Sequence, residues 1–149
     1  MYDKQLTGSI GLFYACYRLS LIGWNTLPTI RNARGPDIIL VKDEKKLGIQ
    51  VKTLSAEADV PLGNNYNDPS VDFWIVLMNV RKGEQQKVFI IPQKDIAQGV
   101  TVCEGGVNSS TNLVYHDQPK ADGKITCWLN KKFLLGAEHG YAEAWQSIK

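Results

Sequence analysis

Apolar residues recur every three or four positions near the start of the chain, which is the period of an α-helix. One apolar row consists of Ile10, Phe13, Tyr17 and Leu21, and a second consists of Leu12, Cys16, Leu19 and Ile22. The pattern therefore predicts a helix from about residue 7 to residue 22 that packs on more than one side. Thr7 or Ser9 would cap its start, and Gly23 would end it.

After residue 36 the pattern changes to the alternation that is typical of β-strands. Two strands, 37–41 and 47–53, flank the polar turn KDEKK. In the second strand Leu47, Ile49 and Val51 share one face, and Gly48, Gln50 and Lys52 share the other. If the turn centres near Glu44, antiparallel pairing brings Asp37 beside Gln50 and Lys52. Three polar side chains are therefore predicted to converge at one end of a hairpin.

The rest of the chain predicts a single α/β or α+β unit. In chain order we expect a loop at 25–36 that ends in a Gly-Pro pair, a long connection at 54–70, a hairpin of the central strands VDFWIVLMNV and KVFIIP, a helical turn at 94–98, a loop at 99–112, a strand at 124–130 and a closing amphipathic helix from Phe133 to Ile148. The connection at 54–70 has a length typical of binding or subunit contact. Trp145 has the spacing of a helix and is predicted to pack in the core, and the chain end around it is a second candidate for an interface.

Composition agrees with one domain that spans residues 1–149. The hydrophobic fraction of 44% and the charged fraction of 21% are those of a soluble globular protein, and no apolar run approaches the roughly 20 residues of a membrane span. The segment MYDKQLTGS lacks the basic and apolar regions of an export signal, so we expect a cytoplasmic protein. Cys16, Cys103 and Cys127 lack metal-ligand spacing and are predicted to be buried thiols.

A net charge of +2 permits nucleic-acid binding without requiring it. The basic positions that we consider are Arg31, Arg34, Lys42, Lys45, Lys46, Arg81 and Lys82. Solvated turns would explain most of the lysines. The two arginines lie shortly before Asp37 in the sequence, and a pair of arginines next to an acid favours contact with phosphate. The hairpin turn and the segment 81–87 are our candidates for reading DNA bases.

The chemistry that fits the hairpin is that of a hard cation. Asp37 and Gln50 offer oxygen ligands of the kind that Mg²⁺ takes, and Lys52 lies two residues from Gln50. Such a cation activates a water molecule and stabilises charge on a phosphorane, while a lysine orients the nucleophile or helps to deprotonate it. The expected reaction is phosphodiester hydrolysis. An ordinary salt bridge between Asp37 and Lys52 is the alternative.

The array GPD, hairpin, QVK resembles the PD-(D/E)xK nuclease superfamily, in the variant where Gln replaces the second acid. The segment GSIGLFYACYRLSLIGWNTLPTIRNARGPD also resembles the opening helix and loop of that family. Within the superfamily the chain is similar to the homing endonuclease encoded by bacterial group I introns. The resemblance implies an α/β, restriction-endonuclease-like core with a mixed sheet flanked by helices. It also implies Asp37 and Gln50 as ligands of Mg²⁺ and Lys52 as the catalytic lysine. It also implies a homotetramer on a long, pseudo-palindromic double-stranded DNA target.

The sequence departs from that family at one position. The family often has an acid in a GxxGE-like context of the first helix, and here the segment reads Gly8-Ser9-Ile10-Gly11-Leu12. Leucine cannot bind a metal, so Asp37 is the only carboxylate of the set. We therefore predict a chain that binds DNA but cuts it slowly or not at all. A natural loss of the acid would have this effect, and an introduced substitution is the simpler explanation because the rest of the site is intact.

Three other functions agree with the same residues. A junction resolvase would prefer branched DNA to linear duplex. An RNA nuclease of related fold would prefer RNA and would not need the metal. A silent DNA-binding or protein-inhibitor module would bind without cutting even with an acid at position 12. Any nuclease of this size contributes one site per subunit, so cutting both strands requires at least a dimer.

Overall fold

The computed structural model describes residues 3–149 except 31–33, 64–65, 103–111, 117–119 and 137–138. Arg31 and Cys103 therefore lie outside the described residues. The helices and strands, in chain order, are α1 (Lys4–Leu21), β1 (Asn25–Pro28), β2 (Ile38–Lys42), β3 (Lys45–Thr53), β4 (Val60–Gly63), β5 (Phe73–Met78), β6 (Lys87–Pro92), α2 (Gln93–Gln98), β7 (Val100–Val102), β8 (Val114–His116), β9 (Cys127–Leu129) and α3 (Lys131–Gly136), with short 3-10 turns at Gly83–Gln85 and Trp145–Ser147.

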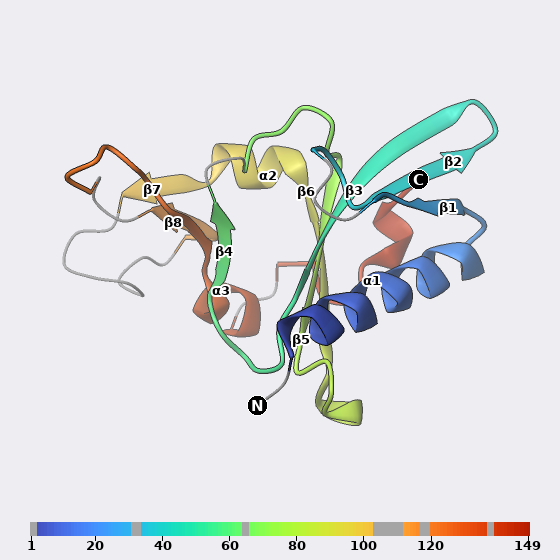
Figure 1. The fold of residues 1–149 in the computed structure, drawn as a ribbon, viewed down its shortest axis with the longest axis horizontal. Helices are drawn as coiled ribbons and strands as arrows, with labels where there is room; N and C mark the ends of the chain where they lie inside the picture. Colours follow the sequence, from blue (N-terminus) through green and yellow to red (C-terminus); the bar gives the residue numbers. More distant parts are fainter. Residues whose placement is uncertain (1–2, 31–33, 64–65, 103–111, 117–119, 137–138) are drawn as a thin grey trace.

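The strands form two sheets. The larger sheet has the order β1-β2-β3-β5-β6, in which β3 and β5 run parallel and the other neighbours antiparallel. The smaller sheet has the order β4-β9-β8-β7, with β7 and β8 parallel. In Figure 1 the larger sheet extends from β5 and β6 at the centre to β1, β2 and β3 at the upper right, with α1 below these three strands and the smaller sheet at the left. The predicted mixed sheet flanked by helices is confirmed. No described helix is both long and apolar enough to cross a membrane.

Helix α1 starts earlier than its apolar pattern predicts. Its N-cap is Asp3, whose carboxylate accepts a hydrogen bond of 2.8 Å from the Gln5 backbone N–H, so the predicted caps at Thr7 and Ser9 were wrong. The helix ends at Leu21, and Gly23 follows with φ of 97°, which favours glycine.

The face of α1 that contacts the sheet is built from small residues. It consists of Thr7, Gly11, Ala15 and Leu19. Of the two predicted rows, one contributes Leu19 and three partly buried residues to the core, and the other, Ile10, Phe13, Tyr17 and Leu21, is exposed. The prediction that the helix packs on more than one side is therefore wrong for the chain by itself.

The β2–β3 hairpin has the predicted arrangement with a tighter turn. Ile38 pairs with Ile49 and Lys42 with Lys45, so only Asp43 and Glu44 form the turn. Asp43 adopts φ of 54° there, a conformation that Asp tolerates better than most residues. The strands therefore extend one or two residues further into the KDEKK segment than the apolar pattern suggests.

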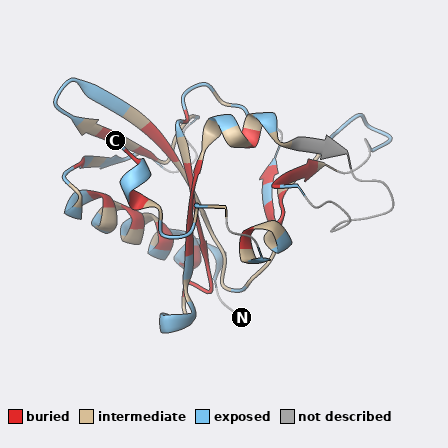
Figure 2. Cartoon of the chain, turned by 180° about the vertical axis from the view of Figure 1, so that it is seen from behind, coloured by how far each residue is buried: buried red, intermediate tan, exposed pale blue. Residues whose placement is uncertain are grey.

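Two hydrophobic cores lie on opposite faces of the larger sheet. The first contains Leu19 of α1, Ile49 of β3 and Trp145 near the carboxyl end, and the second contains Trp74 of β5, Ile96 of α2 and Leu129 of β9. Strands β5 and β6 contribute to both, which confirms the predicted central hairpin (Figure 2). Trp145 is only 3% exposed, which confirms the prediction that it packs in the core. The interface expected at this end of the chain stays a prediction.

Three predicted loops contain strands that were missed. Asn25–Pro28 forms the edge strand β1, where the proline occupies the last position. Val60–Gly63 forms β4 within the connection 54–70, and Tyr66 of that connection packs against the second core. Val100–Val102 forms β7. All three strands have only three or four residues, too few for an alternating pattern to be recognised.

The predicted closing helix is wrong. A helix of six residues, α3, ends at Gly136, and Gly140 has φ of 76°. The chain then pairs with β6 through an isolated bridge between Phe89 and Ala142. The apolar positions thus belong to three different local structures, and the glycines that weakened the helical pattern are where it is interrupted.

Candidate functional site

Asp37 lies directly before β2, at the end of the hairpin away from its turn. Its backbone N–H donates to the Ile49 carbonyl at 2.8 Å, and its carboxylate Oδ2 accepts a hydrogen bond of 2.8 Å from the Val51 N–H. Strand β3 continues past the end of β2, so the Asp37 side chain bonds a backbone group that the neighbouring strand would otherwise pair. This contact fixes the carboxylate beside the second half of β3, as the sequence predicts.

Gln50 and Lys52 lie on the same face of β3, opposite the face that packs under α1. Both are half-buried. Lys52 is close enough that its positive charge lowers the pKa of Asp37. Burial acts more strongly in the other direction, and the pKa of the Asp37 carboxyl is raised above its ordinary value despite the Val51 hydrogen bond and Lys52. The Asp37 carboxylate is therefore partly desolvated, and the positive charge of Lys52 does not fully offset the cost of burying it.

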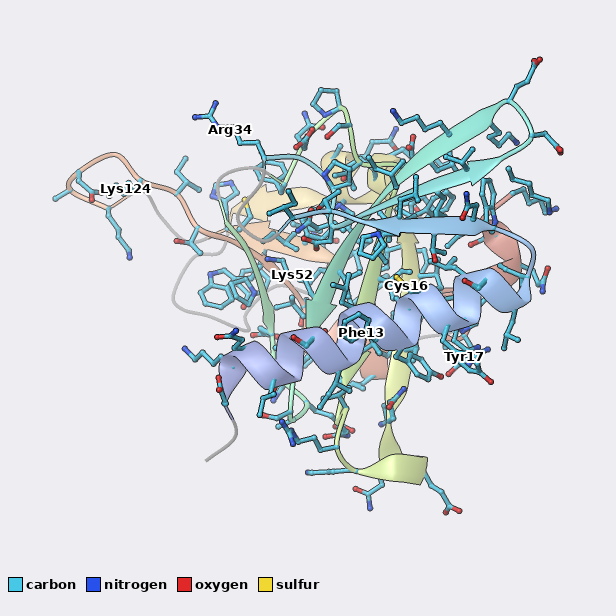
Figure 3. All side chains as sticks on the ribbon, turned by 45° about the vertical axis from the view of Figure 1, so that its right-hand side comes forward. Phe13, Cys16, Tyr17, Arg34, Lys52 and Lys124 are labelled. Atoms are coloured by element: carbon cyan, nitrogen blue, oxygen red, sulfur yellow. The ribbon has the colours of Figure 1, made fainter. Side chains whose placement is uncertain are left out.

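The predicted site residues line one cleft of about 470 Å³ beside α1, where β3 continues past the end of β2. Its lining consists of Gln5, Gly8, Ser9, Leu12, Thr29, Ile30, Gly35, Asp37, Gln50, Val51, Lys52 and Thr53. Figure 3 shows Lys52 on β3 behind α1. The structure thus brings Leu12 from the helix to the same cleft as Asp37, Gln50 and Lys52, and Asp37 is the one acid among these lining residues.

A second hollow, of about 540 Å³, continues from this cleft, and the two share Gly35, Gln50 and Lys52. Arg34 lies on its rim, so of the proposed DNA contacts this arginine lies beside the site. The hollow also contains Asp68, which the sequence reasoning missed. Asp68 accepts hydrogen bonds from the backbone and side chain of Ser70, and the side-chain bond is the main reason that its pKa is lowered. The pattern Asp-Pro-Ser marks a turn but gives no sign that it lies against β3.

Gly48, two residues before Gln50, is covered by the segment that contains Ser70. A Cβ atom at Gly48 would lie 1.9 Å from the Ser70 carbonyl oxygen. The backbone groups of Gly48 also bond Asp72, its N–H to the carboxylate and its carbonyl to the Asp72 N–H, each at 2.8 Å. The chain therefore crosses β3 so closely that only glycine fits.

The other proposed DNA contacts that the structure describes lie away from the cleft. Lys42 and Lys45 line a separate hollow at the turn of the hairpin. There the Lys42 ammonium lies 5.8 Å from the centre of the Trp24 ring, and the Lys45 ammonium donates to the Lys149 carbonyl at 3.0 Å. Lys46 is exposed near the same turn. Arg81 and Lys82 follow β5, in the turn at the bottom of Figure 1.

The cleft offers few ligands to a metal ion. Among the described residues no group of three or more His, Cys, Asp or Glu side chains could hold one. Cys16 is partly buried and Cys127 buried, each as a free thiol. The residues nevertheless suit Mg²⁺ bound mainly through water and substrate, because the Asp37 carboxylate and the Gln50 amide supply oxygen, the element that Mg²⁺ prefers. The raised pKa of Asp37 agrees with this fit, since a cation would relieve the cost of its burial.

No family model and no curated protein matches the sequence. Among solved structures, the fold of this chain is similar to that of a bacterial homing endonuclease, I-Ssp6803I. The TM-score is 0.55 and the sequence identity 18%, and the match covers 98% of this chain and 92% of the other. The likeness confirms the predicted fold class, a restriction-endonuclease-like mixed sheet flanked by helices.

Proposed function

We propose that this chain is a homing-type endonuclease that binds a long double-stranded DNA target, uses Mg²⁺, and is impaired in cleavage. The observation that carries the proposal is the cleft, where Asp37, Gln50 and Lys52 meet the Leu12 position of the first helix. The similarity of fold to I-Ssp6803I over nearly the whole chain supports the same reading.

Each residue has a role that follows from its place. Asp37 and Gln50 would hold the cation through their side-chain oxygens. Bound there, Mg²⁺ would provide an activated water and neutralise charge that grows on the phosphate. Lys52, half-buried on the same strand face, would orient the nucleophile and stabilise a phosphate oxygen. Arg34, on the adjoining hollow, would contact a neighbouring phosphate of the same strand.

Leu12 explains why cleavage would be slow. Its side chain lines the cleft but offers no oxygen, so the cation would depend on one carboxylate and one neutral amide. Affinity for DNA depends far more on phosphate contacts than on this position, and binding would persist. One site per chain cuts one strand, so both strands require two copies, and we propose a homotetramer as the working form.

The proposal is tested by selecting bound fragments from a random and genomic duplex library. Enrichment of one long, roughly symmetric site is expected. The enriched duplex then serves as substrate for the chain, for Leu12→Glu and for Leu12→Glu with Lys52→Met, each with and without Mg²⁺. We expect little or no cutting by the chain, Mg²⁺-dependent cutting by Leu12→Glu, and loss of that cutting in the double variant.

Three outcomes would contradict this reading. Cutting by the unaltered chain as fast as by Leu12→Glu would refute the role of position 12. Preference for four-way junctions over the selected duplex would indicate a resolvase. Binding without cutting by Leu12→Glu would indicate a silent DNA-binding module.

A further inference from the structure

Helix α1 carries an apolar stripe on the side away from the sheet. The stripe consists of Leu6, Ile10, Phe13, Tyr17 and Leu21. These side chains are between 37% and 64% exposed, although they are among the largest apolar groups of the chain. Figure 3 shows Phe13 and Tyr17 on the outer side of α1. Scattered exposed apolar residues are ordinary, but five on one face of one helix mark an interaction surface.

The spacing of the stripe suits a second helix. Steps of four, three and four residues from Leu6 to Tyr17 are those of the seam along which two helices pack. From Leu6 to Leu21 the stripe extends about 22 Å along the helix. It contains no charged residue, so two identical stripes would meet without like charges facing each other.

We propose that the stripe is the contact surface for a second copy of this chain, with the two α1 helices packed antiparallel about a two-fold axis. The proposal deepens the homo-oligomeric nuclease proposed above by naming the surface through which two copies associate. The two aromatic and three aliphatic side chains offer roughly 500 Å² per copy, or about 1,000 Å² in a symmetric pair. That area is about the minimum for a specific interface.

The antiparallel direction follows from the ends of the helix and from the cleft. It sets the positive amino-terminal end of each helix dipole beside the negative carboxyl-terminal end of the other. The α1 residues that line the cleft, Gly8, Ser9 and Leu12, lie between about a quarter and a half of a turn from the centre of the stripe. In an antiparallel pair the two-fold axis is perpendicular to both helices and to the line that joins them. This axis places both clefts on the same side of the pair, where one DNA duplex can reach both.

A lipid surface fits the stripe less well than a second copy. Helices that lie on membranes carry many Lys and Arg residues beside their apolar face. Helix α1 has two basic residues, Lys4 and Arg18. Arg18 is engaged within the chain, where it donates to the Tyr14 hydroxyl at 2.8 Å and lies 3.5 Å from the Glu143 carboxylate.

The test uses Phe13→Lys, because the middle of the stripe falls at Phe13 and an antiparallel pair places this residue against its own copy. Light scattering after gel filtration measures the mass of the chain, of Phe13→Lys and of Ile125→Lys at micromolar concentration. Ile125 is the matched control, since it is also exposed and apolar and lies at the far end of the molecule, beside Lys124 in Figure 3. Circular dichroism and urea unfolding report whether each variant is folded.

We expect Phe13→Lys to be folded and to have half the mass of the unaltered chain, through at least 100-fold weaker association of the pair, while Ile125→Lys keeps the full mass. If Phe13→Lys fails to fold, Tyr17→Lys is measured in its place with the same expectation. A monomeric unaltered chain, or an unchanged mass in the folded stripe variant, would overturn the proposal. A monomer that sediments with anionic vesicles only when the stripe is intact would assign the surface to lipid instead.

A second measurement reports the direction of the helices. Under mild oxidation Phe13→Cys is expected to form a disulfide-linked dimer, whereas Leu6→Cys and the unaltered chain are not. Cross-linking by Leu6→Cys, with or without cross-linking by Phe13→Cys, would refute the antiparallel arrangement, because only parallel helices bring position 6 of one copy beside position 6 of the other. These readouts do not involve DNA, so the interface stands if Leu12→Glu proves inactive, and the nuclease stands if the mass does not change.

Discussion

Replacing Gly11 by alanine separates helix propensity from packing, because the two predict opposite signs. Gly11 lies in the middle of α1 with its backbone against β3. Alanine favours a helix by about 1 kcal/mol relative to glycine, so propensity alone predicts a more stable protein. An added Cβ would lie 1.8 Å from Thr53 Oγ1 and 2.8 Å from both Thr53 Cβ and Cγ2.

Rotation of the Thr53 side chain moves Oγ1 and Cγ2 but leaves its Cβ in place. The contact at 2.8 Å therefore persists, and the helix must move away from the strand. Overpacking of this kind costs about 1–3 kcal/mol, and this site belongs at the upper end because the backbone has to shift. After the gain in propensity, we expect Gly11→Ala to lower the free energy of unfolding by about 2 kcal/mol.

Urea unfolding followed by the fluorescence of Trp24 and Trp145, both in the core beneath α1, measures this change. Gly8→Ala is the matched control, because it lies in the same helix and a Cβ there meets nothing within 4 Å. It should stabilise the protein by up to about 1 kcal/mol. Thr53→Ala removes two of the three contacts, so the double variant should recover at least about 1 kcal/mol. Equal stabilisation by Gly8→Ala and Gly11→Ala would refute the close approach of α1 to β3.

Three further predictions concern the site and its surroundings. Because the pKa of Asp37 is raised in the folded protein, the contribution of this carboxyl to stability is present at acid pH and is lost as pH rises through the folded-state pKa. Asp37→Asn, whose amide oxygen still accepts a hydrogen bond from Val51, should therefore be at least as stable as the original chain at pH 7. It should lose that advantage near pH 4, as urea titrations would show. Mg²⁺ at ten times its dissociation constant should raise the free energy of unfolding by about 1.4 kcal/mol in the original chain and have no such effect in Asp37→Asn, as thermal melts would show. Burial and the nearby Asp95 raise the pKa of Tyr141 to about 12. Stability should therefore decline between pH 10 and pH 12, because this tyrosine ionises at lower pH in the unfolded chain than in the folded protein. Tyr141→Phe should lessen that decline and cost about 1 kcal/mol of stability at pH 7, because it removes the hydrogen bond to Asp95.

The hairpin and the position of Asp37 could be predicted because local rules determine them. A two-strand pairing around a polar turn fixes which residues lie opposite each other, and an error of one residue at the turn does not move Asp37 away from the second half of β3. The central hairpin was predictable for a similar reason, since long apolar runs of Val, Ile and Phe favour buried strands.

The sequence was a poor guide to which face of α1 meets the sheet. The contact residues Thr7, Gly11 and Ala15 are small, so the stronger apolar signal came from the opposite side. Strand β3 lies so close to this face that only small residues fit there, and no local sequence pattern indicates this closeness. The position of Asp68 beside Gln50 and Lys52 depends in the same way on the path of a long connection, and the sequence reasoning missed it.

The crossing of β3 by the segment around Ser70 also has a consequence for recognising distant relatives. Because a Cβ at Gly48 would meet the Ser70 carbonyl oxygen, any chain that keeps this crossing must keep glycine two positions before the residue that stands at Gln50. The short signature then lengthens to Asp, a hairpin, and Gly-x-Gln-x-Lys or Gly-x-Glu-x-Lys. Sequences too divergent for a match along their length could be sorted by that pattern into those that share this crossing and those that do not.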